Sequence, residues 1–336
     1  MLTRIKIEKL FHRFDYDIEL KAKGITILTG PNGYGKTTVL KILDAFAKRN
    51  ASLLEIPFEK ITLELADQKL IEITQNSWKW CGALQVYFVT EQRLWLNANN
   101  KIIPTIQEDA RKLLVIIQER LTAFSKVAQE LDSSFPHRLF SQQEKISEVE
   151  FKQRFEQIKK IQRTLNSYDI ADFKEDNHPS YRAEDARALA VYIADTEKKL
   201  AVFAELLEKL NLFTEILNQR RFTFKQIHIS KDQGFTLSTD DGNLLKLTDL
   251  SSGEQQEVVM LYELLFSVQP GTLVLIDEPE LSLHVVWQQE FLKDLEKIVA
   301  WQKIQVIIAT HSPQIINEHW DSVVDLWDLH HAKPTE

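Results

Sequence analysis

The segment Gly30-Pro-Asn-Gly-Tyr-Gly-Lys-Thr-Thr38 constrains the fold of this 336-residue chain more than any other segment. It follows residues 25–29, whose apolar character predicts a buried strand, and it precedes residues 39–46, which have the periodicity of a helix. A strand, a glycine-rich loop and a helix in this order are typical of a phosphate-binding loop. Glycines let backbone amides approach phosphate oxygens, and the positive N-terminal end of the helix attracts the same anion. The sequence therefore predicts an α/β core that binds a nucleotide.

The residues of this loop have distinct predicted roles. Lys36 would neutralise the β- and γ-phosphate oxygens, and the Thr37 hydroxyl would hold Mg2+. The alternative, a glycine-rich turn that matches the pattern by chance, is less favoured because a strand and a helix flank the loop. The predicted nucleotide-binding residues of the loop are Gly30, Pro31, Asn32, Gly33, Tyr34, Gly35, Lys36, Thr37 and Thr38.

Composition narrows the class of protein. A hydrophobic content of 44% is enough to bury a sizeable core. The single cysteine, Cys81, excludes a disulfide framework and fits a reducing compartment. Because we find no apolar run of about 18 residues and no signal-peptide pattern, we expect a cytoplasmic protein without a membrane span. The net charge of −8 favours protein partners over permanent binding to a nucleic-acid backbone.

Alternating and apolar segments predict strands at both ends of the chain. Residues 60–66 and 69–75 have the pattern of a hairpin, and a second hairpin is expected around Asp241-Gly242. A helix should run from Lys36 to about Lys48. The other predicted strands are 2–8, 15–20, 24–29, 84–89, 222–229, 273–277 and 306–310.

A glycine-free region with helical spacing separates these two ends. Breaks at Phe135-Pro136 and Asn177-His178-Pro179 predict three long helices, the outer two of roughly 25 and 38 residues, which together form an arm. A projecting coiled coil and an ordinary helical domain packed on the core fit this spacing equally well. The predicted domains are an N-terminal lobe at 1–104, the arm at 105–221 and a C-terminal lobe at 222–336.

A second predicted anion site is Leu250-Ser-Ser-Gly-Glu-Gln-Gln256, which opens an amphipathic helix. Hydroxyls, a glycine and a helix N-terminus can together bind a phosphate. One ATP cannot occupy this site and the phosphate loop of the same chain if the two lie far apart, but two chains facing each other could each supply one half. The alternative is a serine N-cap, with Glu254 completing a capping box. The predicted binding residues here are Ser251, Ser252, Gly253 and Glu254.

Polar residues also follow three apolar segments that read as strands. Asp277 and Glu278 end the strand at 273–277, where Asp277 would coordinate Mg2+ and Glu278 would polarise the attacking water. His311 follows the strand at 306–310 and could hydrogen-bond the γ-phosphate and the water. Gln92 follows the strand at 84–89 and fits a residue that senses Mg2+ and the γ-phosphate. Each of these residues could instead be an ordinary strand end or a structural histidine. The phosphate loop in the same chain favours the functional interpretation over the structural one.

These motifs, in this order, resemble those of the ABC-type ATPase superfamily. The phosphate loop resembles its Walker A motif, Gln92 its Q-loop, residues 250–255 its LSGGQ signature, 273–278 its Walker B motif and His311 its switch histidine. The resemblance implies an α/β fold: an ABC-ATPase head, made of a mixed β-sheet and a P-loop α/β core, with an inserted helical or coiled-coil arm. Two positions depart from the pattern, because Ser252 replaces the first signature glycine and His284 stands where transporters often carry aspartate.

The insertion between Q-loop and signature resembles the SMC/RecF/OLD branch of this superfamily. The phrase Asp277-Glu-Pro-Glu-Leu-Ser-Leu-His284 is most similar to OLD-type ATPases and to ATPase subunits of antiphage systems. Few residues follow His311, so we expect no nuclease domain of the OLD type in this sequence. The lone cysteine likewise argues against a zinc-hook motif.

The resemblance leaves two functional hypotheses. In the first, the chain is a regulatory ATPase whose homodimer, or larger assembly, encloses ATP and Mg2+ and controls a separate effector, a nuclease or toxin of bacterial defence. In the second, it is a RecF-like clamp that closes on DNA when ATP is bound. The negative net charge favours the first hypothesis. In both, Lys36, Glu278 and His311 are the predicted catalytic residues, and Thr37, Gln92 and Asp277 the predicted metal ligands.

Overall fold

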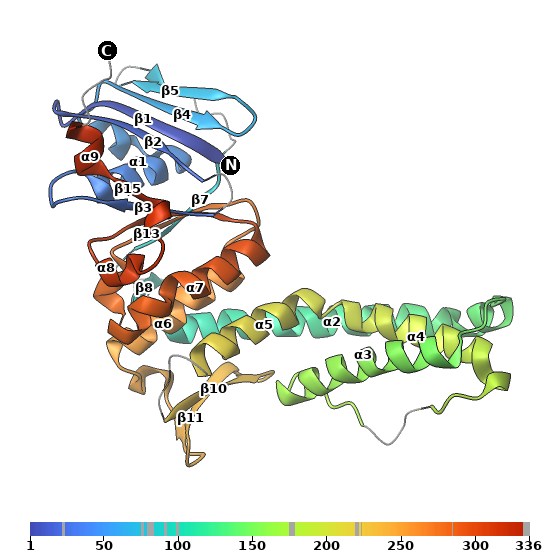
Figure 1. The fold of residues 1–336 in the computed structure, drawn as a ribbon. Coiled ribbons are helices and arrows are strands. Elements are labelled where there is room, and N and C mark those ends of the chain that lie inside the picture. Colours follow the sequence, from blue (N-terminus) through green and yellow to red (C-terminus); the bar gives the residue numbers. More distant parts are fainter. Residues whose placement is uncertain are drawn as a thin grey trace. The chain divides into compact units, whose positions relative to one another are not determined.

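The computed structural model describes residues 1–21, 24–74, 77–78, 84–90, 93–98, 101–174, 179–218, 222, 224–283 and 285–331. The chain divides into two compact units, which we describe separately (Figure 1). The first unit joins Met1–Thr105 to Leu250–Glu336, and the second is Ile106–Asp249. Residues 222–249, which we expected in the C-terminal lobe, are grouped here with the helices of the second unit.

An antiparallel sheet forms one layer of the first unit. Its strand order is β2-β1-β4-β5-β6. The predicted hairpin at 60–75 is confirmed, because β4 and β5 pair antiparallel. The alternating burial of β4 directs Ile61, Leu63 and Leu65 into the core. The strands are β1 (Leu2–Leu10), β2 (Phe14–Glu19), β4 (Lys60–Leu65), β5 (Leu70–Thr74) and β6 (Ser77–Trp78).

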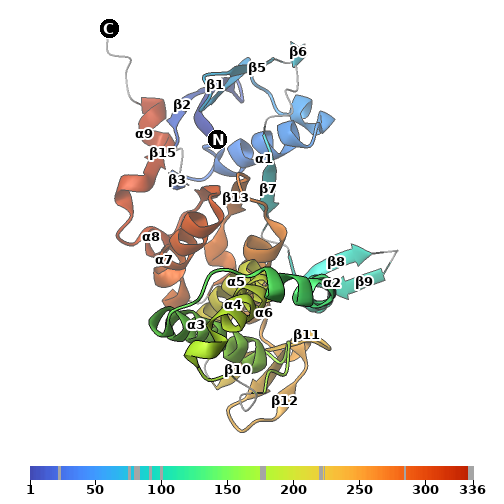
Figure 2. The same cartoon turned by 90° about the vertical axis from the view of Figure 1, so that its right-hand side faces the viewer.

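A parallel sheet forms the second layer, in the order β15-β3-β14-β13-β7. Helix α1 (Lys36–Ala47) lies between the two sheets, whereas α6 and α7 cover the opposite face of the parallel sheet (Figure 2). Strands β3, β13 and β14 are buried along their whole length, which explains why their sequences are continuously apolar. The strands are β3 (Ile25–Thr29), β7 (Val86–Val89), β13 (Leu273–Asp277), β14 (Gln305–Ala309) and β15 (Val323–Asp325).

Shorter elements complete the first unit. Helix α6 (Ser252–Tyr262) continues into a π-helical turn at Glu263–Ser267, and a 3-10 turn at Pro279–Ser282 follows β13. The remaining elements are α7 (Val285–Gln302), α8 (Pro313–Ile316), α9 (Leu326–His331) and the hairpin of β8 (Trp95–Ala98) and β9 (Lys101–Pro104). Among the described residues, no helix has the length and hydrophobicity needed to cross a membrane.

Among its described residues, the second unit has four long helices and a small antiparallel sheet, where we expected three helices. The predicted third helix is divided at Val202 and Phe203, because Phe203 turns inward, is fully buried and packs on Phe124. The break expected at residues 177–179 falls partly outside the described residues, and coiled-coil geometry stays a prediction. The elements are α2 (Thr105–Ser141), α3 (Glu148–Ser167), α4 (Ala186–Ala201), α5 (Ala204–Ile216), β10 (Lys225–Ser230), β11 (Gly234–Thr239) and β12 (Leu244–Leu245).

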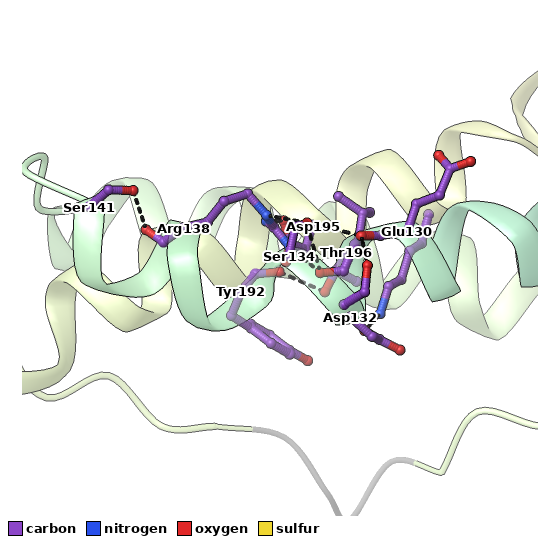
Figure 3. A network of polar contacts seen from close by, with 11 residues as sticks. Glu130, Asp132, Ser134, Arg138, Ser141, Tyr192, Asp195 and Thr196 are labelled. Atoms are coloured by element: carbon purple, nitrogen blue, oxygen red, sulfur yellow. Dashed lines mark hydrogen bonds and ion pairs between the residues drawn. The ribbon is translucent and has the colours of Figure 1, made fainter.

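The break predicted at Phe135-Pro136 is wrong, because α2 continues through Pro136 to Ser141. A proline inside a helix removes one backbone donor and usually ends or bends the helix. Here Arg138 compensates: its guanidinium donates to the carbonyl oxygen of Leu131, seven residues and about two turns back, and forms an ion pair with Asp195 on α4 (Figure 3). Tertiary contacts therefore hold the last turns of α2 in helical form.

Candidate nucleotide-binding site

The site lies at one edge of the parallel sheet, where β3, β13 and β14 end. The carboxyl ends of parallel strands share one edge, so this topology brings the phosphate loop, Asp277, Glu278 and His311 together. In the loop, Gly35 has φ 84°, and a Cβ added there would lie 3.1 Å from the Leu10 side chain. Both its left-handed backbone and this close approach therefore favour glycine at position 35.

The ammonium group of Lys36 lies at the centre of the site, although the residue is only 5% exposed. Its Nζ donates to the carbonyl oxygens of Gly30, at 2.9 Å, and Pro31, at 3.4 Å. Burial lowers the pKa of Lys36, and the nearby carboxylates of Glu278 and Asp277 oppose that shift. The loop thus holds a cation where a polyphosphate would need its charge neutralised.

Thr37 and Asp277 form the pair expected at a Mg2+ site. Thr37 Oγ1 donates to Asp277 Oδ1 at 2.9 Å, and Asp277 is 9% exposed. The described residues contain no group of three or more histidine, cysteine or acidic side chains that could hold a metal ion without further ligands. A hydroxyl and one carboxylate fit Mg2+ that takes its other ligands from phosphate and water, as in nucleotide sites. The residues present therefore fit a Mg2+–nucleotide pair.

Glu278 has a strained backbone and a perturbed carboxyl group. Its φ of 43° places a non-glycine residue in the left-handed region, which proteins tolerate at sites fixed by their surroundings. Burial is the main cause that raises the pKa of Glu278, to about 8, followed by a hydrogen bond to and repulsion by Glu280, while Lys36 opposes the shift. Ionisable side chains that shift the pKa of a neighbour, as Glu280 and Lys36 do for Glu278, are frequent at catalytic sites.

His311 lies between Lys36 and Glu278. Its Nδ1 is 3.3 Å from Lys36 Nζ, and its Nε2 is 3.3 Å from Glu278 Oε1. Because the Lys36 ammonium can only donate, Nδ1 must accept, which leaves Nε2 to carry the proton and to donate toward Glu278. Burial and the charge of Lys36 lower the pKa of His311, in agreement with a neutral ring.

The signature segment forms the capping box that was the alternative reading of the sequence. Ser251 Oγ accepts from the Glu254 amide at 3.3 Å, and Glu254 Oε2 accepts from the Ser251 amide at 2.8 Å. Ser251 and Ser252 are nonetheless exposed, and Gly253 is half-buried. The first backbone bond of the helix is from the Gln255 amide to Ser251, so the amides of Ser252 and Gly253 precede the intrahelical pattern. Capping and anion binding are thus compatible at this N-terminus.

Two predicted positions, Gln92 and His284, lie outside the described residues. Arg93, which follows Gln92, is buried; burial lowers its pKa, and the carboxylates of Glu263 and Glu257 oppose that shift. Two further residues support the site, and their sequence context predicts no such role. Asp325 Oδ2 accepts from Thr29 Oγ1 at 2.9 Å beside the loop, and Glu280 binds the segment that carries His311. Glu280 lies in the phrase 277–284 that resembles OLD-type ATPases, but no role was predicted for it.

Comparison with protein families identifies the class. Residues 109–317 match the family described as "AAA domain, putative AbiEii toxin, Type IV TA system". The match covers more than half of the chain, which therefore belongs to this AAA-domain family. It includes the signature, Walker B and switch-histidine segments.

Individual relatives agree with this class. The chain is 33% identical over 132 residues to "Retron Ec83 probable ATPase" of Escherichia coli, covering 33% of this chain and 24% of that protein. It is 25% identical over 195 residues to "Retron Vc95 probable ATPase" of Vibrio cholerae serotype O1 biovar El Tor, covering 49% and 36%. It is 32% identical over 112 residues to "Protein ea59" of Escherichia phage lambda, covering 33% and 21%. These matches span only about a fifth to a third of the relatives' length.

The family match and the retron relatives agree with the predicted placement among ABC-type ATPases of the SMC/RecF/OLD branch. Among solved structures, SMC head domains from Pyrococcus furiosus and Thermotoga maritima align with 96% of this chain and with 92% and 94% of their own chains. Both have 12% identity and a TM-score of 0.41. Because these values are low, the α/β fold is assigned from the observed strand order and the helices that flank the parallel sheet.

Proposed function

We propose that this chain is an ATP-binding and hydrolysing regulatory subunit. It forms a homodimer, or a larger assembly, around two ATP–Mg2+ and controls a separate effector, a nuclease or toxin of bacterial antiphage defence. The observation that carries the ATPase part is the arrangement of Lys36, Thr37, Asp277, Glu278 and His311 at one sheet edge.

Each of these residues has a role that its contacts support. When bound, ATP with Mg2+ supplies the phosphoanhydride bond to be hydrolysed. Lys36 and the loop amides bind and neutralise the phosphates, and Thr37 with Asp277 holds the metal. Glu278 orients the attacking water and accepts its proton at Oε1 or Oε2. His311 Nε2 donates a hydrogen bond at the same point, and we propose Gln92 as a further contact to Mg2+ and the γ-phosphate.

The position of the signature supports a dimer. Helix α1, which begins at the phosphate loop, and α6, which begins at the signature, cover opposite faces of the parallel sheet (Figures 1 and 2). The exposed residues Ser251 and Ser252 are therefore available to a second copy of the chain. We propose that the signature segment binds the γ-phosphate held by the partner's loop, with Ser251 exchanging its capping bond for that contact.

The regulatory role rests on the comparisons. The family description mentions a toxin and a Type IV TA system, and two relatives are retron ATPases. Control of a separate effector is consistent with the negative net charge, which favours a protein partner.

The first experiment measures ATP hydrolysis and ATP-dependent dimerisation. Glu278→Gln should bind ATP but lose about 10²–10³-fold in kcat, the effect expected on removing one preorganised transition-state group. In ATP, this variant should accumulate as a dimer in gel filtration with light scattering. Turnover at the parent rate would contradict the role of Glu278.

A second variant tests the contribution of the partner subunit. Ser251→Arg, in the Glu278→Gln background, should bind ATP as a monomer and fail to dimerise. Ser147→Arg is the matched control, because Ser147 is also an exposed serine N-cap, on α3, and accepts from the Glu150 amide at 3.2 Å. Equal dimerisation of the two double variants would refute the partner-supplied signature.

The DNA-clamp hypothesis is tested separately. Duplex DNA binding is measured by electrophoretic shift at low salt, with and without ATP, on the Glu278→Gln variant. An ATP-dependent shift that weakens steeply with salt would favour the clamp over effector control. Absence of binding at low salt would reject the clamp.

A further inference from the structure

One carboxylate oxygen holds three consecutive residues of the His311 segment. Glu280 Oε1 accepts from Thr310 Oγ1 at 2.6 Å, from the His311 amide at 2.8 Å and from the Ser312 amide at 3.0 Å. Charge-assisted bonds of this kind are about twice as strong as neutral ones. Thr310 is fully buried, so water is excluded from one side of this cluster.

These bonds fix the backbone from which the imidazole projects. The Thr310 amide donates to the Leu28 carbonyl at 3.2 Å, which ties the start of the segment to β3. Past Thr310, the segment leaves the sheet. The His311 amide donates to Glu280 Oε1, and the Ser312 amide is shared between Glu280 Oε1 and Thr310 Oγ1, at 3.0 Å each. A shift of this backbone by one ångström would break the 3.3 Å contacts of the ring with Lys36 and Glu278.

A second set of contacts closes a ring around the same segment. Ser312 Oγ donates to Gln288 Oε1 on α7 at 2.7 Å. Gln288 Nε2 in turn donates to the carbonyl oxygens of Leu283, at 3.1 Å, and Glu280, at 3.3 Å. The side chain and the backbone of Glu280 therefore both belong to a closed circuit that includes His311, Ser312 and Gln288.

We infer that Glu280 is a positioning residue, which fixes the His311 segment against the end of β13 and couples the orientation of His311 to the turn Pro279–Ser282. Leu281 in this turn is 67% exposed, so the circuit has one end at the surface and the other at the phosphate-binding site. A displacement of the turn is transmitted to His311 through bonds, without movement of the sheet. This inference rests on the proposed ATPase function for its kinetic consequence only.

The kinetic test compares Glu280→Ala, Glu280→Gln and the parent. Loss of the acceptor in Glu280→Ala should lower kcat by about 10–100-fold while the KM for ATP changes less than about threefold, because His311 is misplaced and the loop is intact. Glutamine keeps one acceptor oxygen and should restore kcat to within about fivefold of the parent. Glu296→Ala, an exposed carboxylate of α7 that pairs with His319, is the matched control and should have parent kinetics.

A double-mutant cycle separates positioning of His311 from a general structural effect. If Glu280 acts through His311, Glu280→Ala should lower kcat less than about threefold in a His311→Ala background. An equal fold-loss in both backgrounds, or parent kinetics of Glu280→Ala, would overturn the inference.

Hydrogen exchange tests the same inference without any catalysis. In the parent, the His311 amide should be protected by Glu280, and Glu280→Ala should speed its exchange by at least about tenfold, whereas Glu280→Gln should not. The Ser312 amide also donates to Thr310 Oγ1 and should respond less. Unchanged exchange in Glu280→Ala would overturn the inference even if the protein hydrolyses ATP. Faster exchange in a protein that does not hydrolyse ATP would instead reject the proposed function and keep the positioning role.

Discussion

The ion pairs between helices of the second unit and the acids at the nucleotide site of the first unit use carboxylates in opposite ways. In the second unit, individual carboxylates are matched to a cation: Arg154 makes bonds of 2.8 and 2.6 Å with Glu197, and Lys199 lies 2.8 Å from Asp132. In the first unit, the acids at the end of β13 are concentrated around Lys36, with one carboxyl pKa raised and a residue in a left-handed backbone.

This difference distinguishes carboxylates that link structural elements from carboxylates that can bind a metal or move a proton. Matched pairs hold helices α2, α3 and α4 together and leave little charge to attract a ligand. Crowded carboxylates repel one another, so they cost stability and remain available to bind a metal or move a proton. Substitutions at the nucleotide site should therefore change binding and turnover, and substitutions among the packed helices of the second unit should change the free energy of unfolding.

The largest expected effect is at Lys36. Lys36→Ala should weaken ATP binding by about 10²–10³-fold, because charge-assisted bonds to the phosphates and neutralisation of their charge are both lost. Isothermal titration calorimetry with ATP and Mg2+ measures the change. Lys41→Ala removes an exposed lysine from the same helix and should bind ATP like the parent. Similar affinities for the two variants would break the proposed distinction between the units.

The next effect is expected in the second unit, at Gly234. A Cβ on this residue would lie 1.9 Å from the carbonyl oxygen of Ala110 on α2, so Gly234→Ala must separate β11 from that helix. We expect a loss of about 3 kcal/mol or more in the free energy of unfolding, measured in urea, with ATP affinity unchanged. Gly242→Ala is the matched control, since Gly242 also has a positive φ but nothing within 4 Å of an added Cβ; it should lose only about 1 kcal/mol.

The third effect depends on pH and concerns Asp109 on α2. Burial raises the pKa of Asp109 to about 6, against the opposing effect of Lys112. Because the raised pKa favours the protonated form in the folded state, Asp109 contributes to the free energy of unfolding below about pH 4. This contribution is lost as the pH rises through 6. Asp109→Asn should therefore stabilise the chain by roughly 2–3 kcal/mol at pH 8 and hardly at all at pH 4.

Urea unfolding at both pH values measures this difference between Asp109→Asn and the parent. Glu108→Gln changes the neighbouring, less buried carboxylate and should alter stability by less than about 0.5 kcal/mol at either pH. An equal gain for Asp109→Asn at pH 4 and pH 8 would show that titration of Asp109 does not contribute.

The sequence predicted the central sheet because burial on both faces leaves a continuous apolar run, as in β3, β13 and β14. It predicted the edge of that sheet as a site because polar residues follow those runs directly. The role of Glu280 could not be predicted, because it depends on a side chain bonding to a segment thirty residues further along the chain. The residues next to Glu280 in the sequence do not indicate a partner at that distance along the chain.

The second unit shows the same limit for helices. Pro136 predicts a break on local grounds, and only the contact of Arg138 with Asp195 on another helix explains why α2 continues. Conversely, the apolar spacing runs without interruption past Val202 and Phe203, where the chain turns. Hydrophobic periodicity indicates which face of a helix is buried. A turn that keeps the same face buried does not interrupt this periodicity, so the sequence does not indicate the turn.

The pairing of β3 with β14 and β15 has a consequence for synthesis on the ribosome. Ile27, just before the phosphate loop, lies in register with Ile308 on one side and Val323 on the other. The nascent phosphate loop therefore has no completed sheet until Asp325 has emerged, while the helices of the second unit can pair much earlier. Such long-range pairing makes the last step of folding slow. The nucleotide site therefore forms after the helices of the second unit, which delays nucleotide binding until those helices are in place.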